Sequence, residues 1–168
     1  MHPFPHHYAV SIAAAPAGAV QITGEALPEI HSTAPPEFGG PPGHWSPETL
    51  LTAAVADCLV LGFRAVASAA RFTWVRLECR AEGVLERPER VTQFTGFTVW
   101  ATLHVPAGAD VQRARTLLEK SEQVCLISHS LKGSKRLEIE VVTVASGGAE
   151  FGDTSPSISR RTCSGATR

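Results

Sequence analysis

The residues with the clearest chemical potential are two of the chain's four cysteines, Cys58 and Cys125. Cys58 lies in the apolar stretch SPETLLTAAVADCLVLGFR, residues 46–64, directly after Asp57. Cys125 lies in EKSEQVCLISHSL. A thiol is a nucleophile as its thiolate, but a free cysteine is also among the residues most often buried in a protein core. Taken singly, each cysteine is more typical of a structural residue than of a reactive one.

The other candidate ligands and thiols do not form a recognisable site. Cys79 falls on the inward face of a predicted strand and is interpreted as structural, and Cys163 as incidental. No pair of cysteines has C-x-x-C spacing, which argues against a zinc ribbon or a thioredoxin-type motif. The adjacent His6 and His7 lack a clear third ligand, so no metal site is expected.

Charge and composition exclude several classes of partner. The net charge is −1 and 43% of residues are hydrophobic, which indicates a globular chain with no preference for nucleic acid or an anionic membrane. The start, MHPFPHHYAV, lacks the features of a secretory signal. The longest apolar run is too short to span a bilayer and carries Asp57, so a cytoplasmic protein without a membrane partner is expected.

The first half of the chain predicts a hairpin, a long loop and a helix. Alternation around residues 8–12 and 20–22 is typical of two paired strands. The stretch LPEIHSTAPPEFGGPPGHW is too rich in Pro and Gly for regular structure. Ser46 is placed to cap a helix that has Pro47 at its first position and continues to about Ala70.

The second half predicts a strand pair, a helix and a last strand. Alternation from Phe72 onward and in TGFTVWATLHV indicates antiparallel strands joined at RPERV. The side chains predicted to point inward on the second of these strands are Phe97, Val99, Ala101, Leu103 and Val105. A helix follows Gly108, and RLEIEVVTV is the final strand. The order β-β-α-β-β-α-β defines an α+β domain over residues 1–145, and residues 146–168 are expected to be disordered.

The contexts of the two cysteines resemble the OsmC/Ohr family of thiol peroxidases, named for osmotic induction and organic hydroperoxide resistance. The resemblance rests on a Pro-Glu pair with Glu48 ten residues before a mid-helix Cys58, and on a second helix that delivers Cys125. It covers roughly residues 6–145. It implies an OsmC-like fold, with two antiparallel sheets wrapped around central helices in an intertwined homodimer.

The resemblance also implies a chemistry. Cys58 would attack an organic hydroperoxide and become a sulfenic acid, and Cys125 would condense with it to a disulfide. No bound cofactor is implied; an external dithiol, lipoyl-type in this family, would restore the thiols. Glu48 matches the carboxylate that orients a catalytic Arg. One helix separates Glu48 from Cys58 by ~15 Å, so a partner helix could bring one chain's Glu48 towards the other's Cys58.

The chain departs from the family at that Arg, because no Arg or Lys precedes Arg64. An unperturbed thiol is only a few per cent thiolate at neutral pH, so an activating cation would matter. His44, shortly before the helix, is the best-placed substitute, although a plain loop residue is the alternative interpretation. The sequence gives no role for Asp57, which could pair with Arg64 or Arg71.

Two functions therefore remain. The first is a stress-response oxidoreductase, an antioxidant enzyme that reduces organic hydroperoxides through a redox-active cysteine. The second is an OsmC-like protein that keeps the fold and the cysteines without efficient peroxidase activity, and binds a small hydrophobic ligand or takes part in thiol-disulfide exchange. The retained Cys58, Cys125 and Glu48 favour the first function, and the missing Arg favours the second.

Overall fold

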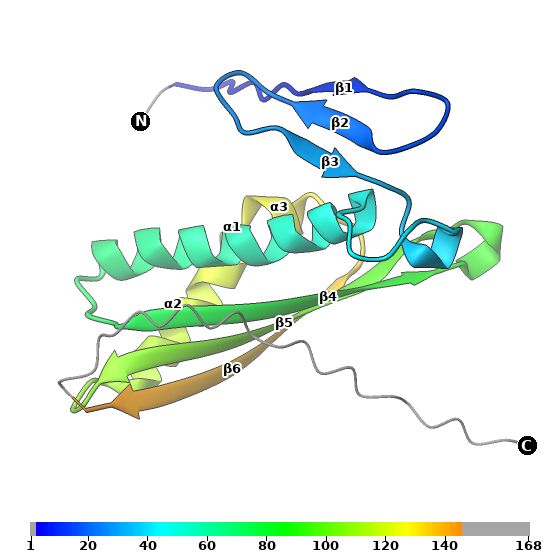
Figure 1. Ribbon diagram of the computed structural model, residues 1–168. Coiled ribbons are helices and arrows are strands. Elements are labelled where there is room, and N and C mark those ends of the chain that lie inside the picture. Colours follow the sequence, from blue (N-terminus) through cyan, green and yellow to red (C-terminus); the bar gives the residue numbers. More distant parts are fainter. Residues whose placement is uncertain (1–2, 146–168) are drawn as a thin grey trace, which may run out of the picture.

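A computed structural model describes residues 3–145 as an α+β fold with two separate three-stranded sheets (Figure 1). The first sheet has the order β1-β2-β3, built from Ser11–Ala13, Val20–Thr23 and Ile30–Ser32. The second has the order β4-β5-β6, built from Arg76–Glu86, Gln93–Pro106 and Ser134–Val144. The tail predicted over 146–168 lies outside the described residues.

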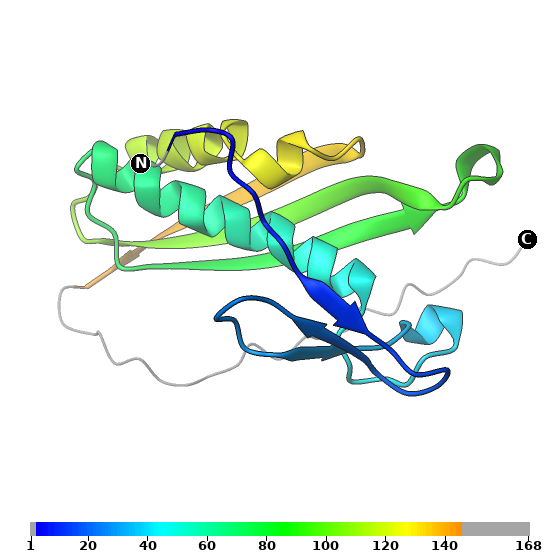
Figure 2. The ribbon, with the colours of Figure 1, turned by 90° about the horizontal axis from the view of Figure 1, so that it is seen from above.

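Three helices lie on one face of the second sheet, as the two ribbon views agree (Figures 1 and 2). They are α1 (Pro47–Ala69), α2 (Val111–Gln123) and the single turn α3 (Leu126–His129). There are also two short 3-10 turns: η1 (Pro36–Phe38) precedes α1, and η2 (Pro88–Arg90) joins β4 to β5.

Helix α1 begins and ends where its sequence predicts. Ser46 forms a capping box with Thr49, Pro47 occupies the first turn, and the helix ends at Ala69. Its inner stripe recurs every four residues at Val55, Leu59, Phe63 and Ala67, all at most 3% exposed. This stripe fixes which face of α1 meets the sheet.

Much of α1 is nevertheless left uncovered by its own chain. Among the described residues it is the one helix long and apolar enough to cross a membrane, a test that the core helix of a soluble protein also passes. Only 22% of its most apolar window is buried within the chain. Leu61, on the outer face, is 51% exposed. A helix that is apolar all round is normally buried, so the exposed face of α1 is expected to pack against a further surface.

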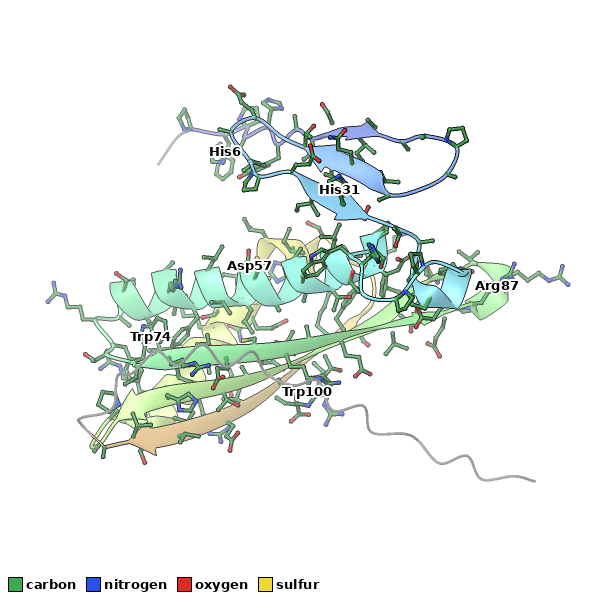
Figure 3. All side chains as sticks on the ribbon, in the orientation of Figure 1. His6, His31, Asp57, Trp74, Arg87 and Trp100 are labelled. Atoms are coloured by element: carbon green, nitrogen blue, oxygen red, sulfur yellow. The ribbon has the colours of Figure 1, made fainter. Side chains whose placement is uncertain are left out.

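The second sheet has a helix-facing apolar side and a charged outer side. All five residues predicted to point inward on β5 are buried, which confirms the alternation. On the outer side Arg80 lies 4.4 Å from the ring centre of Trp100 and pairs with Glu82 at 2.9 Å. Figure 3 shows Trp100 on this side, and Trp74 between α1 and the sheet. We therefore expect the charged outer side of the sheet to face solvent.

Three details of the predicted topology are wrong. The second sheet is mixed, because β4 and β5 are antiparallel as expected but β6 runs parallel to β5. A third strand, β3, lies inside the predicted loop and pairs with β2, and Ser32 at its end bridges to Trp45. The second predicted helix is divided at Val124 into α2 and α3. The crossover through two helices explains the parallel pair, since such a connection returns the chain to the same end of the sheet.

The first sheet stands away from the rest of the chain (Figure 1). Its register aligns Ile12, Ile22 and Ile30 across the three strands as one apolar row. Ile12 is 65% exposed and Ile30 39%. In the described part of the chain, β1, β2 and β3 pair extensively only with one another. Within residues 3–145, the row is left largely uncovered.

Candidate functional site

Two sulfurs that are distant in the sequence meet on the helical side of the second sheet. Cys58 lies in the middle of α1 and is half-buried; Cys125 is the N-cap of α3 and is 2% exposed. Their side chains are within hydrogen-bonding reach of one another. Both are free thiols. The structure therefore brings together the two cysteines singled out from the sequence.

The turn that carries Cys125 also supplies hydrogen-bond donors to both sulfurs. The backbone N–H groups of Ile127 and Leu126 donate to the Cys58 sulfur. The Ser128 hydroxyl donates to the Cys125 sulfur over 3.2 Å. These donors were not predicted from the sequence, although the position of Ser128, three residues after a helix N-cap, is a signal for the hydroxyl donor.

The electrostatics of Cys58 are set by burial and by these donors. Burial raises the pKa of the Cys58 thiol above its ordinary value, and the neighbouring Cys125 side chain raises it further. The N–H groups of Ile127 and Leu126 lower the pKa in part, because they stabilise the thiolate. The net direction is upward. Within residues 3–145, no cationic side chain is among the groups that act on this thiol.

His44 does not take the place of the missing Arg within one chain. It is exposed, and its Nδ1 lies 3.1 Å from the carbonyl oxygen of Pro42 in its own loop. The contacts of the Cys58 thiol come from Cys125 and the α3 turn. Within one chain His44 is therefore a loop residue, and its role as a substitute for the Arg stays a prediction.

Glu48 lies apart from the sulfur pair, at a cavity of about 700 Å³. Trp45 and Phe38 line the cavity from the loop before α1, and Cys79 and Phe94 line it from the sheet. The Oε2 atom of Glu48 is buried and has no hydrogen-bond partner among the described residues. A buried carboxylate oxygen without a partner is unfavourable, so this oxygen is expected to meet a donor that residues 3–145 do not supply.

A third thiol, that of Cys79, lines this cavity. Burial raises the pKa of Cys79 to about 11. Cys79 packs as a small apolar side chain against the core cluster of Val55, Leu59, Phe97 and Val99. A thiol kept protonated in this way is a poor nucleophile, in keeping with the structural role expected for it.

Asp57 is not a buried charge. It is exposed on the outer face of α1 (Figure 3), and among the described residues it forms no ion pair. The pairing with Arg64 or Arg71 considered above is therefore absent from the single chain. An exposed carboxylate needs no such partner.

The chain is thus an α+β protein in which a long helix packs on a mixed sheet. Two free thiols face each other on the helical side of that sheet. A family model of OsmC-like proteins matches residues 40–140, which include both cysteines and the elements that carry them. The chain belongs to the OsmC-like protein family. Its low sequence identity to its relatives makes it a divergent member.

Individual relatives are distant in sequence. The chain is 27% identical over 114 residues to the uncharacterized protein YmaD of Bacillus subtilis, which covers 63% of this chain and 73% of YmaD. An OsmC-like protein of Mycoplasma pneumoniae has a TM-score of 0.68 at 14% identity, over 84% of this chain and 99% of that one. An organic hydroperoxide resistance protein OsmC of Legionella pneumophila has a TM-score of 0.64 at 24% identity, over 82% and 98%. These likenesses show the fold.

Proposed function

We propose that the protein is a cysteine-based thiol peroxidase that reduces organic hydroperoxides. The observation that carries the proposal is the meeting of Cys58 and Cys125, one accessible and one buried, beside a turn that donates to both sulfurs. The hydroperoxide resistance protein of Legionella pneumophila has the same fold, which agrees with the proposal.

The chemistry begins at the half-buried thiol. The Cys58 thiolate attacks the distal oxygen of the hydroperoxide; the O–O bond breaks, and the alkoxide takes a proton and leaves as the alcohol. Cys58 is then a sulfenic acid. Cys125 attacks its sulfur, the S–O bond breaks, water leaves, and a Cys58–Cys125 disulfide forms. An external dithiol reduces this disulfide by exchange and is itself oxidised.

Backbone donors take part of the role of the missing cation. Two N–H groups aimed at one sulfur stabilise a developing thiolate, although less than a guanidinium would. Because the pKa of Cys58 remains raised, the thiolate is a minor form at neutral pH. Peroxide consumption should therefore increase steadily as the pH rises through the ordinary range of a thiol.

A homodimer completes the proposal. Three features lack a partner within residues 3–145, and a second chain could supply one to each: the outer face of α1, the apolar row on the first sheet and the Glu48 Oε2 atom. An antiparallel partner helix would carry one chain's Glu48 towards the other chain's Cys58. Mixing Glu48→Ala and Cys58→Ser chains should then restore part of the activity in heterodimers. Heterodimers without activity would contradict a site shared between chains.

The alternative function keeps the fold without efficient turnover. The absence of a cation at Cys58 within the described residues and the largely apolar cavity beside Glu48 favour it. In that case the cavity holds a small hydrophobic ligand, or the sulfur pair exchanges disulfides with another thiol protein. Either activity needs the sulfur pair or the cavity, but not a fast attack on peroxide.

One assay separates the two functions. The wild-type protein, with dihydrolipoamide as reductant, should consume cumene hydroperoxide at least a hundredfold faster than Cys58→Ser. Cys79→Ser is the matched control, because this thiol lies outside the sulfur pair; its activity should stay within about twofold of the wild type. Wild-type turnover no faster than that of the free dithiol would leave only the alternative function.

A further inference from the structure

The hydroxyl of Ser128 makes an unusual choice of partner. Ser121 and Ser130 send their hydroxyls back to backbone carbonyls four residues earlier, at 2.6 and 2.9 Å, as serines in helices commonly do. Ser128 instead donates to the Cys125 sulfur at 3.2 Å. Both residues are buried, at 4% and 2% exposure. A buried hydroxyl directed to a sulfur gives that sulfur a fixed donor.

The local backbone makes this arrangement possible. Cys125 is the N-cap of α3, and its side chain makes no capping hydrogen bond. The turn is closed by the His129 N–H, which donates to the Cys125 carbonyl at 3.1 Å. The third residue of the turn, Ser128, therefore lies over the N-cap side chain. The same turn that directs two N–H groups to Cys58 directs one hydroxyl to Cys125.

We propose that Ser128 is a positioning residue for the resolving thiol: it holds the Cys125 sulfur towards Cys58 and stabilises the negative charge that this sulfur carries when the disulfide is made and broken. This inference rests on the proposed function and extends it to a residue that does not touch the peroxide. Within one chain, the donor does for Cys125 part of what a cation would do.

The charge lies on Cys125 in both half-reactions. When the disulfide forms, the Cys125 thiolate attacks the Cys58 sulfur, the S–O bond breaks, and hydroxide leaves and takes up a proton as water. When an external dithiol reduces the disulfide, its thiolate attacks Cys58, the S–S bond breaks, and Cys125 leaves as a thiolate. The Ser128 hydroxyl stabilises that leaving thiolate. Together with the burial of Cys125, it directs the incoming reductant to Cys58.

The first test separates the steps of a single turnover. Ser128→Ala removes the donor, Ser128→Thr keeps a hydroxyl, and Ser121→Ala is the matched control of a buried serine bonded to a carbonyl. After one equivalent of cumene hydroperoxide, Ser128→Ala should form the sulfenic acid at the wild-type rate. It should form the disulfide about tenfold more slowly, as expected for the loss of a hydrogen bond to a charged group. The longer-lived sulfenic acid should also be over-oxidised more readily in excess peroxide.

A second measurement is independent of peroxide. Equilibration of the Cys58–Cys125 pair in dithiothreitol redox buffers, at a pH alkaline enough to ionise the reduced thiols, should show the disulfide of Ser128→Ala favoured about five- to tenfold, a shift of about 20–30 mV to more negative potential. The shift should be absent in Ser121→Ala and largely reversed in Ser128→Thr. This readout remains available if the wild type does not consume peroxide, in which case the proposed function fails and the shift still supports the inference.

The outcomes that overturn the inference are specific. Wild-type values of both the disulfide-forming rate and the potential in Ser128→Ala would do so. Equal defects in Ser128→Ala and Ser128→Thr, with Ser128→Thr folded, would also do so, because the hydroxyl would then be irrelevant and only the packing would matter.

Discussion

The chain contains two regions that differ in how far they satisfy themselves. The core unit, residues 47–144, packs its central helix and its sheet around fully buried side chains such as Phe63 and Leu103. The N-terminal unit, residues 11–45, has a three-stranded sheet in which Ser32 alone is buried. A three-stranded sheet with an exposed apolar row is marginally stable on its own. The core unit also holds both sulfurs. The N-terminal sheet, in contrast, is expected to be stable only when its apolar row packs against another surface.

The cavity lies where the two units meet, and it shares this incompleteness. Its walls come from the loop of the N-terminal unit and from the helix and sheet of the core unit. The unpaired Glu48 oxygen lies there, whereas the sulfur pair, inside the core unit, has its donors in place. The sulfur pair thus has hydrogen-bond donors from its own chain, whereas in the proposed homodimer the second chain would supply a donor to Glu48.

The largest effect should come from placing a charge on the uncovered row. Ile12→Glu puts a carboxylate beside Ile22 and Ile30, where a partner chain would have to bury it without a partner. We expect the homodimer to dissociate into monomers at micromolar concentration, as measured by sedimentation velocity. The near-ultraviolet dichroism, to which Trp74 and Trp100 of the core unit contribute, should be largely retained, because the core unit packs independently of this row.

Val111→Glu is the control for that substitution. Val111 is also an exposed apolar side chain, 39% accessible, but it lies in the first turn of α2, where an acid suits the helix dipole. The Val111→Glu protein should therefore remain a dimer. A dimer that survives Ile12→Glu as well would mean that the first sheet is not part of the interface.

The sequence predicted the core unit far better than the N-terminal unit, for a physical reason. The cap at Ser46 and the alternation from Phe97 to Val105 are local signals that match the tertiary packing. Strand β3 has three residues amid Pro and Gly, and its pairing is imposed by β2 and Trp45 rather than by its own propensity. The direction of β6 depends on the helical crossover before it, and the alternation of apolar residues does not predict strand direction.

The site shows the same division. The two cysteines could be selected from their sequence contexts, and the structure brings them together. The donors from Leu126 and Ile127 are backbone groups, so no residue type signals them. The exposure of His44 and Asp57 follows from the path of the loop and the rotation of α1, which the sequence does not specify.

Two phenylalanines sharpen the comparison of stability between the units. Phe63 is 0% exposed and meets Trp74 edge-on, with 5.3 Å between the ring centres; Phe38, in η1, is 59% exposed. Phe63→Ala should lower the free energy of unfolding by about 3–5 kcal/mol, and Phe38→Ala by less than about 1 kcal/mol. Urea denaturation followed by far-ultraviolet dichroism measures both. Equal losses would show that the loop contributes as much as the core.

A smaller effect is expected at Gly83, where the sheet approaches α1. A Cβ atom on Gly83 would lie 2.7 Å from Phe94 Cε1 and 2.9 Å from Thr52 Oγ1. Gly83→Ala should therefore destabilise the protein by about 1–2 kcal/mol and narrow the cavity. In the control, Gly96→Ala, the close contact is the rotatable Ser134 hydroxyl at 2.9 Å, so the loss measured by urea denaturation should be smaller. The reverse order would contradict this packing.

The smallest effect concerns the buried thiol at the junction of the units. Burial raises the pKa of Cys79 from an ordinary value of 9.0 to about 11, so the folded protein keeps this proton when the unfolded chain loses it. The stability from this thiol is fully present below pH 9 and is lost as the pH rises from 9 to about 11. Partial exposure reduces the loss to on the order of 1 kcal/mol. Urea midpoints at pH 8 and pH 10.5 should differ less in Cys79→Ala than in the wild type, because Ala does not titrate. The same pH dependence in both proteins would mean that Cys79 is as well solvated in the folded chain as in the unfolded one, and that the cavity beside it is open to water rather than closed by a partner.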